Sequence, residues 1–423
     1  MGPMDVDLLP NRDALGTGSG GVGMGKSIFN FMAIIIGGGV LGWPNAFKLC
    51  GWFGGLICLL IVCAFAESTM CLMVNIGVTM RTMSYEETCC AVWGSMGFFG
   101  VALTCYLIVF GVLVSYWVAL GTLATPLVAS LLQRPVTVTA VKLGLAAVML
   151  PVCFFRNIGK LPGWSYVCYA FVLFASFTMV YLSYSDEVQA FNGHPEANFE
   201  WIKPGFWPST GTLAFTYVNH DSVFTVFESL TQPTPKRWAL VCRWSMWSTV
   251  ALTCIVGMPI YFALGERTSS DLTDNFPEDI RMMIFVRLCL VCVLLMTWVY
   301  MQQVGRKYLH SLIMPLLRCR LPEPSDSYRM TALEIGGFTF VQFAVTLALG
   351  LAVTDLGLPM ALTGVFAQAL AAFVIPPCLL FTLSRRGQNV GYTRIQMAGF
   401  GGVLIFGVSC CTFGAVQILL GKE

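Results

Sequence analysis

Residues 34–44 read Ile-Ile-Ile-Gly-Gly-Gly-Val-Leu-Gly-Trp-Pro, and this stretch decides how the rest of the chain is interpreted. It lies inside an apolar segment, residues 26–49, that is long enough to cross a bilayer as a helix. Each of the three adjacent glycines costs a helix about 1 kcal/mol relative to alanine. Irregular backbone at membrane depth is tolerated only where protein or a water-filled cavity satisfies its polar groups. We therefore expect an interrupted membrane helix that lines a cavity.

The composition places the whole chain in a bilayer. Hydrophobic residues make up 57% of the sequence and charged residues 11%, against roughly 25% charged residues in soluble domains. A soluble protein must cover its surface with polar groups, and a chain of 423 residues with this composition has too few of them to hide its apolar side chains. The net charge of +2 gives no reason to expect nucleic acid as a partner. We expect an integral, multi-pass protein whose main partner is the lipid bilayer.

Apolar segments of about 20 residues, the length that a helix needs to cross a bilayer, recur along the chain. They predict an all-α membrane protein with eleven transmembrane helices. Residues 1–25 are expected to form a disordered cytoplasmic tail, and residues 26–420 a single transmembrane domain. The eleven candidate segments are residues 26–49, 52–80, 96–128, 137–155, 162–184, 206–230, 239–264, 280–303, 330–353, 358–383 and 393–420.

The distribution of Lys and Arg predicts the orientation. With the N-terminus in the cytoplasm, sixteen of these residues fall on the cytoplasmic side and six on the opposite side, as the positive-inside rule requires. An odd number of helices then places the C-terminus on the extracytoplasmic side. The polar, Gly-rich start lacks the apolar core of a cleavable signal peptide. Both the plasma membrane and a vacuolar or lysosomal type of endomembrane fit this arrangement.

A second interruption lies in the sixth segment, where residues 216–222 read Thr-Tyr-Val-Asn-His-Asp-Ser. The first and sixth segments run in opposite directions, and each begins a block of five helices. Interrupted helices at matching positions of two inverted halves indicate a transporter substrate site. Free N–H groups where the first helix resumes suit a carboxylate, and free carbonyls at the second break suit an ammonium group. An amino acid carries both. Close packing between helices is the alternative for the glycines alone.

Four stretches resemble the amino acid/auxin permease family, especially its sodium-coupled neutral amino acid transporter branch. The resemblance covers most of residues 26–420 and is most specific in the first and sixth helices. It implies a leucine-transporter-type fold, a 5+5 inverted repeat with broken helices 1 and 6 plus helix 11, and alternating access. It also implies a neutral amino acid as substrate, and we expect a monomer. The matching stretches are residues 27–30 with 37–47 and 51–52, residues 214–220 with 227–230, residues 286–288 with Arg306, and residues 358–376.

The resemblance also implies the site residues. The family's substrate-binding elements correspond to Gly37, Gly38, Gly39 and Val40 in the first helix, and to Phe215, Thr216, Asn219 and His220 in the sixth.

The candidates for ion coupling are Asn30, Ala33, Glu67 and Thr297. Ala33 stands where the sodium-coupled branch has asparagine, and Leu295 stands at a position that carries a hydroxyl. Both changes remove oxygens that hold Na⁺, whereas Glu67 and His220 are protonatable groups in the membrane. Coupling to H⁺ or to Na⁺ stays open, and we expect the proton gradient to matter more.

Other functional classes are weaker fits. A carrier of another small solute, such as an amine or an auxin-like molecule, shares the transporter features, and a membrane amino acid sensor shares the site. An enzyme is not expected, because no Ser/His/Asp, Asp–Asp or His-rich set occurs at helical spacing. The three histidines are scattered and most cysteines lie in apolar segments, so neither a metal site nor a cofactor is expected.

Overall fold

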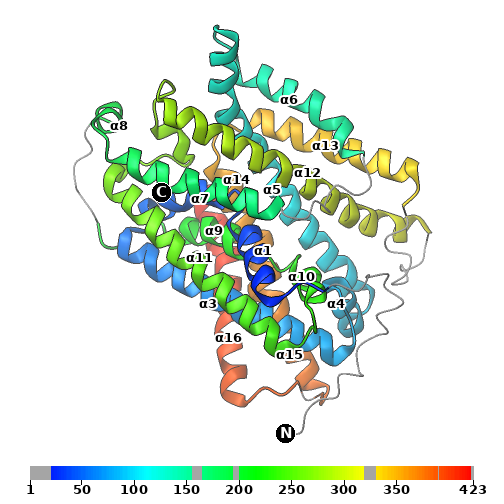
Figure 1. Cartoon of the computed structure of the whole chain (residues 1–423). Coiled ribbons are helices and arrows are strands. Elements are labelled where there is room, and N and C mark those ends of the chain that lie inside the picture. The colour runs from blue at the N-terminus through cyan, green and yellow to red at the C-terminus, as the bar shows by residue number, and fades with distance from the viewer. Residues whose placement is uncertain (1–20, 155–163, 194–199, 319–329, 389, 421–423) are drawn as a thin grey trace.

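The computed structural model describes residues 21–154, 164–193, 200–318, 330–388 and 390–420, and nearly all of this part is helical (Figure 1). Helices occupy all eleven candidate segments. They are α1, η3 and α2 (Met24–Ile36, Gly39–Gly42, Trp43–Cys50), α3 (Trp52–Met80), α5 (Ser95–Leu132), α6 (Val138–Cys153), α7 (Trp164–Ser183), α9 and α10 (Phe206–Tyr217, Val223–Ser229), α11 (Pro235–Leu264), α12 (Arg281–Arg318), α13 (Ala332–Ala352), α14 to α15 (Gly357–Thr363, Gly364–Gln368, Leu370–Val374, Ile375–Arg385), and α16 to α17 (Arg394–Ser409, Cys410–Gly414, Ala415–Leu419).

Eight of the described helices are long and apolar enough to cross a membrane by themselves. A ninth span is the pair formed by Met24–Ile36 and Gly39–Cys50, which is bent by 51° at the glycines. Helix α6 has 16 residues, and α9 and α10 are shorter still, so these segments do not meet the length criterion alone. The multi-pass membrane protein is thus confirmed, whereas eleven crossings remain a prediction.

Two segment boundaries differ from the sequence-based expectation. Helix α12 continues to Arg318 rather than ending near residue 303, because polar side chains in its second half bond to α13. Gln342 donates to Gln302 Oε1 at 3.0 Å, and Arg306 donates to Thr339 Oγ1 at 2.8 Å. The sequence-based prediction ended the segment where polar residues begin. In the structure these residues are buried and hydrogen-bonded, so the helix continues.

The described chain also begins earlier than the predicted tail allows. The Val22 N–H donates to the Ser229 carbonyl at 2.8 Å, and the Thr231 N–H donates to the Val22 carbonyl at 3.0 Å. Helix α1 then starts at Met24. Residues 21–25 are therefore ordered against the end of α10, while residues 1–20 lie outside the described part.

Helices α1, α9 and α10 lie in the centre of the molecule among longer helices (Figure 1). Two sets of close contacts hold these and the surrounding helices together. Trp117 of α5, Trp298 of α12 and Phe343 of α13 form a cluster of edge-to-face rings with centroids 5.0 to 5.7 Å apart. Helix α14 and its π-helical continuation pass α9 at Gly211 and Gly364. A Cβ on Gly364 would lie 1.8 Å from the Gly211 carbonyl oxygen, so the two backbones touch directly.

Candidate functional site

The first break occurs at Gly37, directly after α1. Gly37 has φ 39° and ψ −133°, a conformation that side chains disfavour. Its N–H still donates to the Ala33 carbonyl at 3.2 Å, which closes the helix, and the chain resumes as the short turn Gly39–Gly42 and then α2. The predicted interruption of the first helix is confirmed, and it lies at the glycines.

The second break separates α9 from α10. Val218 is extended, with φ −95° and ψ 101°, and the chain is non-helical from there to Ser222. Asn219 stabilises this turn, because its Nδ2 donates to the Thr216 carbonyl at 2.9 Å and its carbonyl accepts from the Ser222 N–H at 3.2 Å. The predicted interruption of the sixth helix is also confirmed.

The two broken helices cross at their breaks. A Cβ on Gly39 would lie 2.1 Å from Thr216 Oγ1, so only glycine fits here. Trp43 Nε1 donates to the same hydroxyl at 3.2 Å and ties the resumed first helix to α9. Thr216 therefore stabilises the crossing of the two helices. Val40 is buried in the core.

A small cavity of about 30 Å³ lies between the breaks. Of the predicted substrate-binding residues, Gly37, Gly38, Gly39, Phe215 and Asn219 line it, whereas Val40, Thr216 and His220 do not. The volume accommodates roughly two water molecules. The remaining lining residues are mostly apolar and come from α1, α5, the break in the sixth helix, α12 and the π-helical turn: Ile34, Ile35, Ile36, Ile108, Val109, Val112, Tyr116, Val218, Asp221, Met301 and Gln368.

Tyr116 and Gln368 are two cavity residues that the sequence did not single out. The Gly38 N–H donates to Tyr116 Oη at 3.2 Å. Gln368 Nε2 donates to the carbonyls of Phe215 and Val218, each at 3.3 Å. In the sequence, Tyr116 and Gln368 are polar residues within apolar segments, which is a signal for a functional role. Each segment contains other polar residues as well, and the packing of the helices decides which of them reaches a break.

Gln368 reaches the sixth-helix break because of the close crossing described above. Gly364 touches Gly211, and one helical turn further along both helices Gln368 meets the Phe215 carbonyl. The turn Gly364–Gln368 is π-helical, a distortion that is frequent at functional sites.

Asp221 brings a carboxylate to the same cavity. Asp221 lines the cavity together with Val218 and Asn219. It interacts electrostatically with Glu86 of the connecting helix α4 (Tyr85–Trp93). Burial raises the pKa of Glu86 above its ordinary value, and the negative charges of Glu87 and Asp221 raise that pKa further. Acidic side chains therefore extend from the cavity toward α4.

His220 turns away from the cavity and packs against α3. It is 1% exposed, and its Nε2 lies 3.0 Å from Thr69 Oγ1. Because the Thr69 hydroxyl donates to the Phe65 carbonyl at 2.8 Å, the imidazole Nε2–H is the donor to Thr69. The contact anchors the non-helical turn of the sixth helix to α3, which makes His220 a positioning residue.

We expect the His220→Ala variant to lose stability rather than substrate affinity. Removing the ring leaves a buried hole and breaks the bond to Thr69, at a cost of about 2 kcal/mol in the free energy of unfolding. The melting temperature in detergent should fall, while KM should change less than about 3-fold, well under 1 kcal/mol. A large change in KM at an unchanged melting temperature would instead make His220 a ligand.

None of the four candidates for ion coupling lines the cavity. Glu67 accepts from Arg243 Nε at 2.9 Å and from Trp247 Nε1 at 2.7 Å, so its carboxylate links α3 to α11. Thr297 donates to the Val293 carbonyl of its own helix at 2.8 Å. Asn30 and Ala33 are half-buried on α1. The paired carboxylate of Glu67 is better placed for holding two helices together than for carrying protons.

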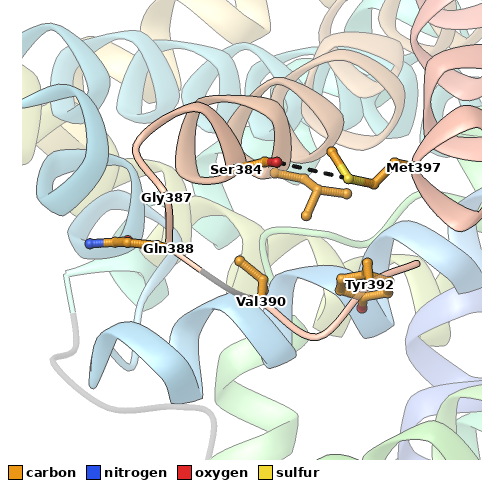
Figure 2. A pocket seen from close by; sticks show the side chains of 7 residues that line it. Ser384, Gly387, Gln388, Val390, Tyr392 and Met397 are labelled. Carbon is orange, nitrogen blue, oxygen red and sulfur yellow. Dashed lines mark hydrogen bonds between the residues drawn. The ribbon is translucent and has the colours of Figure 1, made fainter. Parts of the chain in front are cut away.

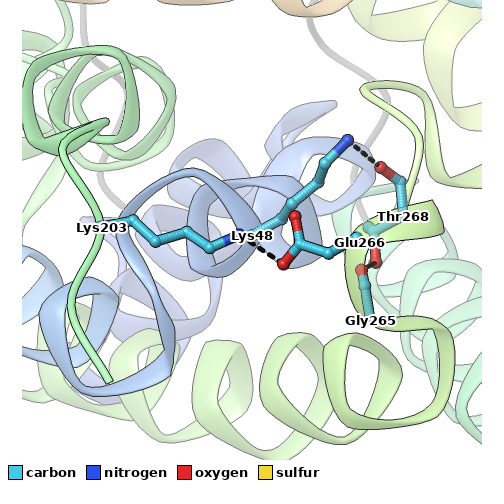
Figure 3. Close-up of polar contacts among 5 residues, drawn as sticks. All are labelled: Lys48, Lys203, Gly265, Glu266 and Thr268. Atoms are coloured by element: carbon cyan, nitrogen blue, oxygen red, sulfur yellow. Dashed lines mark hydrogen bonds and ion pairs between the residues drawn. The ribbon is translucent and has the colours of Figure 1, made fainter. Parts of the chain in front are cut away.

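At the end of the molecule where α11 leads into α12, residues 265–280 form a loop that is tied down by charged residues. Figure 3 shows Lys203 paired with Glu266, and Lys48 donating to the Thr268 carbonyl at 3.0 Å. Arg287 of α12 is 3% exposed and donates to the Phe276 carbonyl at 2.9 Å. These bonds link the loop to α2, to Lys203 and to α12.

A second cavity, of about 230 Å³, lies near the loop between α15 and α16 and is lined by Ser384, Gln388, Tyr392, Met397 and their neighbours (Figure 2). It shares no residue with the cavity at the breaks. Ser384 Oγ and Met397 Sδ lie 3.9 Å apart, a weak contact. Neither of the two breaks contributes a residue to the described lining of this cavity, so we do not assign the substrate to it.

Two broken helices that cross at a cavity inside a polytopic bundle define the protein as a membrane transporter. The chain belongs to the family described as "Transmembrane amino acid transporter protein", whose profile matches residues 20–420. The members of this family are transporters, and the chain is a transporter rather than an enzyme.

Several curated proteins resemble it over most of their length. The putative sodium-coupled neutral amino acid transporter 11 of Danio rerio is 24% identical, over 93% of this chain and 86% of that protein. The sodium-coupled neutral amino acid transporter 7 of Bos taurus is 23% identical over 97% and 90%. The amino acid transporter AVT1B of Arabidopsis thaliana is 22% identical over 93% and 70%.

Among solved structures, a crystal structure of the Eremococcus coleocola manganese transporter shares the fold. It aligns with a TM-score of 0.52 over 93% of this chain and 86% of that chain, at 12% identity. At this identity the likeness concerns the fold alone.

Proposed function

We propose that the protein is a secondary active transporter that moves neutral amino acids by alternating access. The observation that carries the proposal is the meeting of the two helix breaks at one cavity. In this proposal the N–H groups of Gly38 and Gly39 bind the substrate's carboxylate, and the carbonyls of Phe215 and Val218 bind its ammonium group. Helices 1–5 and 6–10 then form the inverted repeat, with helix 11 appended.

The rest of the lining supports a neutral, apolar substrate side chain. Ile108, Val109 and Val112 on α5 face the cavity opposite the isoleucines of α1, and Met301 adds a flexible apolar surface. The names of the relatives, which are neutral amino acid transporters, point to the same substrate class.

For the coupling ion we propose the proton. The names of two relatives favour Na⁺. In this chain, however, Ala33 supplies no side-chain oxygen, and Thr297 lies outside the cavity. Asp221 is a protonatable group that lines the cavity, and ionisable groups at membrane depth mark proton pathways in other carriers.

The test is uptake by vesicles that contain the purified protein, with a panel of labelled amino acids and with amines and auxin-like acids as competitors. We expect accumulation of neutral amino acids under an inward proton gradient at equal Na⁺. An imposed Na⁺ gradient at equal pH is the matched condition. Strong accumulation there and none under the proton gradient would contradict proton coupling, and no amino acid uptake in either condition would contradict the transporter proposal.

The topology belongs to the same proposal. We propose eleven crossings, a cytoplasmic N-terminus, an extracytoplasmic C-terminus, and a monomer in the plasma membrane or a vacuolar or lysosomal membrane. The excess of Lys and Arg on the side of the N-terminus supports the orientation.

A further inference from the structure

The backbone groups proposed to bind the substrate already have partners within the protein. Tyr116 Oη accepts from the Gly38 N–H, on the side proposed for the carboxylate. Gln368 Nε2 donates to the carbonyls of Phe215 and Val218, on the side proposed for the ammonium group. A hydroxyl oxygen thus takes the place of a carboxylate oxygen, and an amide NH₂ takes the place of an NH₃⁺.

Packing holds Tyr116 in this position. A Cβ on Gly38 would lie 2.5 Å from Tyr116 Cε1, and a Cβ on Gly37 would lie 3.1 Å from the hydroxyl. The phenol therefore lies directly on the bare backbone of the two glycines, and Tyr116 is 4% exposed. Any larger residue at either position would push it away.

Gln368 is held on one side only. Its orientation is defined by its partners, because only the NH₂ group donates to two carbonyls. Its Oε1 is buried in the cavity wall and has no partner among the described residues. The side chain is 2% exposed, so water does not replace that partner from bulk solvent. When a substrate enters, its ammonium group can take over the two carbonyls from the Gln368 NH₂ group. The free Gln368 Oε1 can then accept a hydrogen bond from the same ammonium group.

The Gly38 N–H has one proton to donate, so a substrate carboxylate must displace Tyr116 from it. Each carbonyl of Phe215 and Val218 can accept two hydrogen bonds, but the cavity of about 30 Å³ is smaller than any amino acid, so the Gln368 side chain must move to make room for the ammonium group. Conversely, if neither partner were present, a buried N–H and two carbonyls would be unsatisfied, which is strongly unfavourable.

We propose that Tyr116 and Gln368 act as internal substitutes for the substrate. They close the site of the unloaded carrier, so that it can return to the state open to the uptake side without a bound substrate. This inference rests on the proposed transport function. Its consequence is a mode of transport: the protein carries out net uptake, and does not depend on a substrate on the far side as an obligatory exchanger does.

The test compares two assays on the same vesicles: uptake of a labelled neutral amino acid into vesicles without internal substrate, and uptake into vesicles preloaded with the unlabelled compound. The wild type should show both. In Gln368→Leu and Tyr116→Phe the return of the unloaded carrier leaves buried backbone groups unsatisfied. We expect the ratio of net uptake to exchange to fall by at least about 10-fold in each variant.

Tyr106→Phe is the matched control, since Tyr106 lies on the same helix α5 but outside the cavity, and its ratio should equal that of the wild type. Equal losses in both assays, or a wild type that only exchanges, would overturn the inference and leave the transport function intact. Absence of both activities in the wild type would instead refute the transport function. Gln368→Met serves as a second variant if Gln368→Leu does not fold.

Discussion

Uptake should fall by at least about 100-fold when Gly38 or Gly39 is replaced by leucine, while the protein still inserts into the membrane. A Cβ on Gly39 would meet Thr216 Oγ1 at 2.1 Å, and one on Gly38 would meet Tyr116 at 2.5 Å. Overpacking of this kind costs about 1–3 kcal/mol or more, and here it falls on the backbone groups that bind the substrate. The measurement is initial uptake rate, normalised to the amount of protein in the membrane.

Gly25→Leu is the control for this pair. Gly25 lies near the start of α1, the helix that ends at the first break, and a Cβ there meets nothing within 4 Å. Its uptake should match the wild type. Normal uptake by Gly38→Leu would refute the proposed site. A similar loss in Gly25→Leu would show that the effect of leucine is not specific to the break.

The second large effect is expected from one added methyl group at Gly364. In Gly364→Ala the new Cβ would lie 1.8 Å from the Gly211 carbonyl oxygen and 2.5 Å from its carbon, both backbone atoms that cannot rotate away. Helices α9 and α14 must separate, which moves Gln368 from the Phe215 carbonyl. We expect the free energy of unfolding to fall by about 1–3 kcal/mol and uptake to fall at least about 10-fold.

Gly337→Ala isolates the clash from the effect of alanine on helix stability. Both glycines are helical, but a Cβ on Gly337 of α13 meets nothing within 4 Å. This variant should be as stable as the wild type or more so, by up to about 1 kcal/mol. Thermal unfolding in detergent compares the two, and equal melting temperatures would show that the crossing at Gly211 adapts more readily than its geometry indicates.

The interruptions themselves were predictable from residues close together in the chain. Three glycines in an apolar helix, and the polar run from Thr216 to Ser222 in another, destabilise the helix locally wherever the rest of the chain lies. The same holds for the helical segments, since a bilayer demands about 20 apolar residues in a row. Five of the eight substrate residues that the family resemblance implied line the cavity.

Side-chain direction was not predictable in the same way. His220 was expected to line the cavity and Glu67 to carry an ion, because both are ionisable residues at membrane depth. A neighbouring helix decides where each points: α3 receives His220 through Thr69, and α11 supplies Arg243 to Glu67. A sequence shows that such a group needs a partner, but not which helix provides it.

The sequence by itself therefore determined a multi-pass helical protein with two broken helices, because hydrophobic length and glycine content act through local backbone energetics. Only the tertiary structure decided what satisfies the broken ends. Tyr116 is 78 residues from Gly38, and Gln368 is 153 residues from Phe215. Their meeting depends on helix crossings as close as that of Gly211 and Gly364, where packing of whole helices, and not any local preference, sets which side chain reaches the backbone.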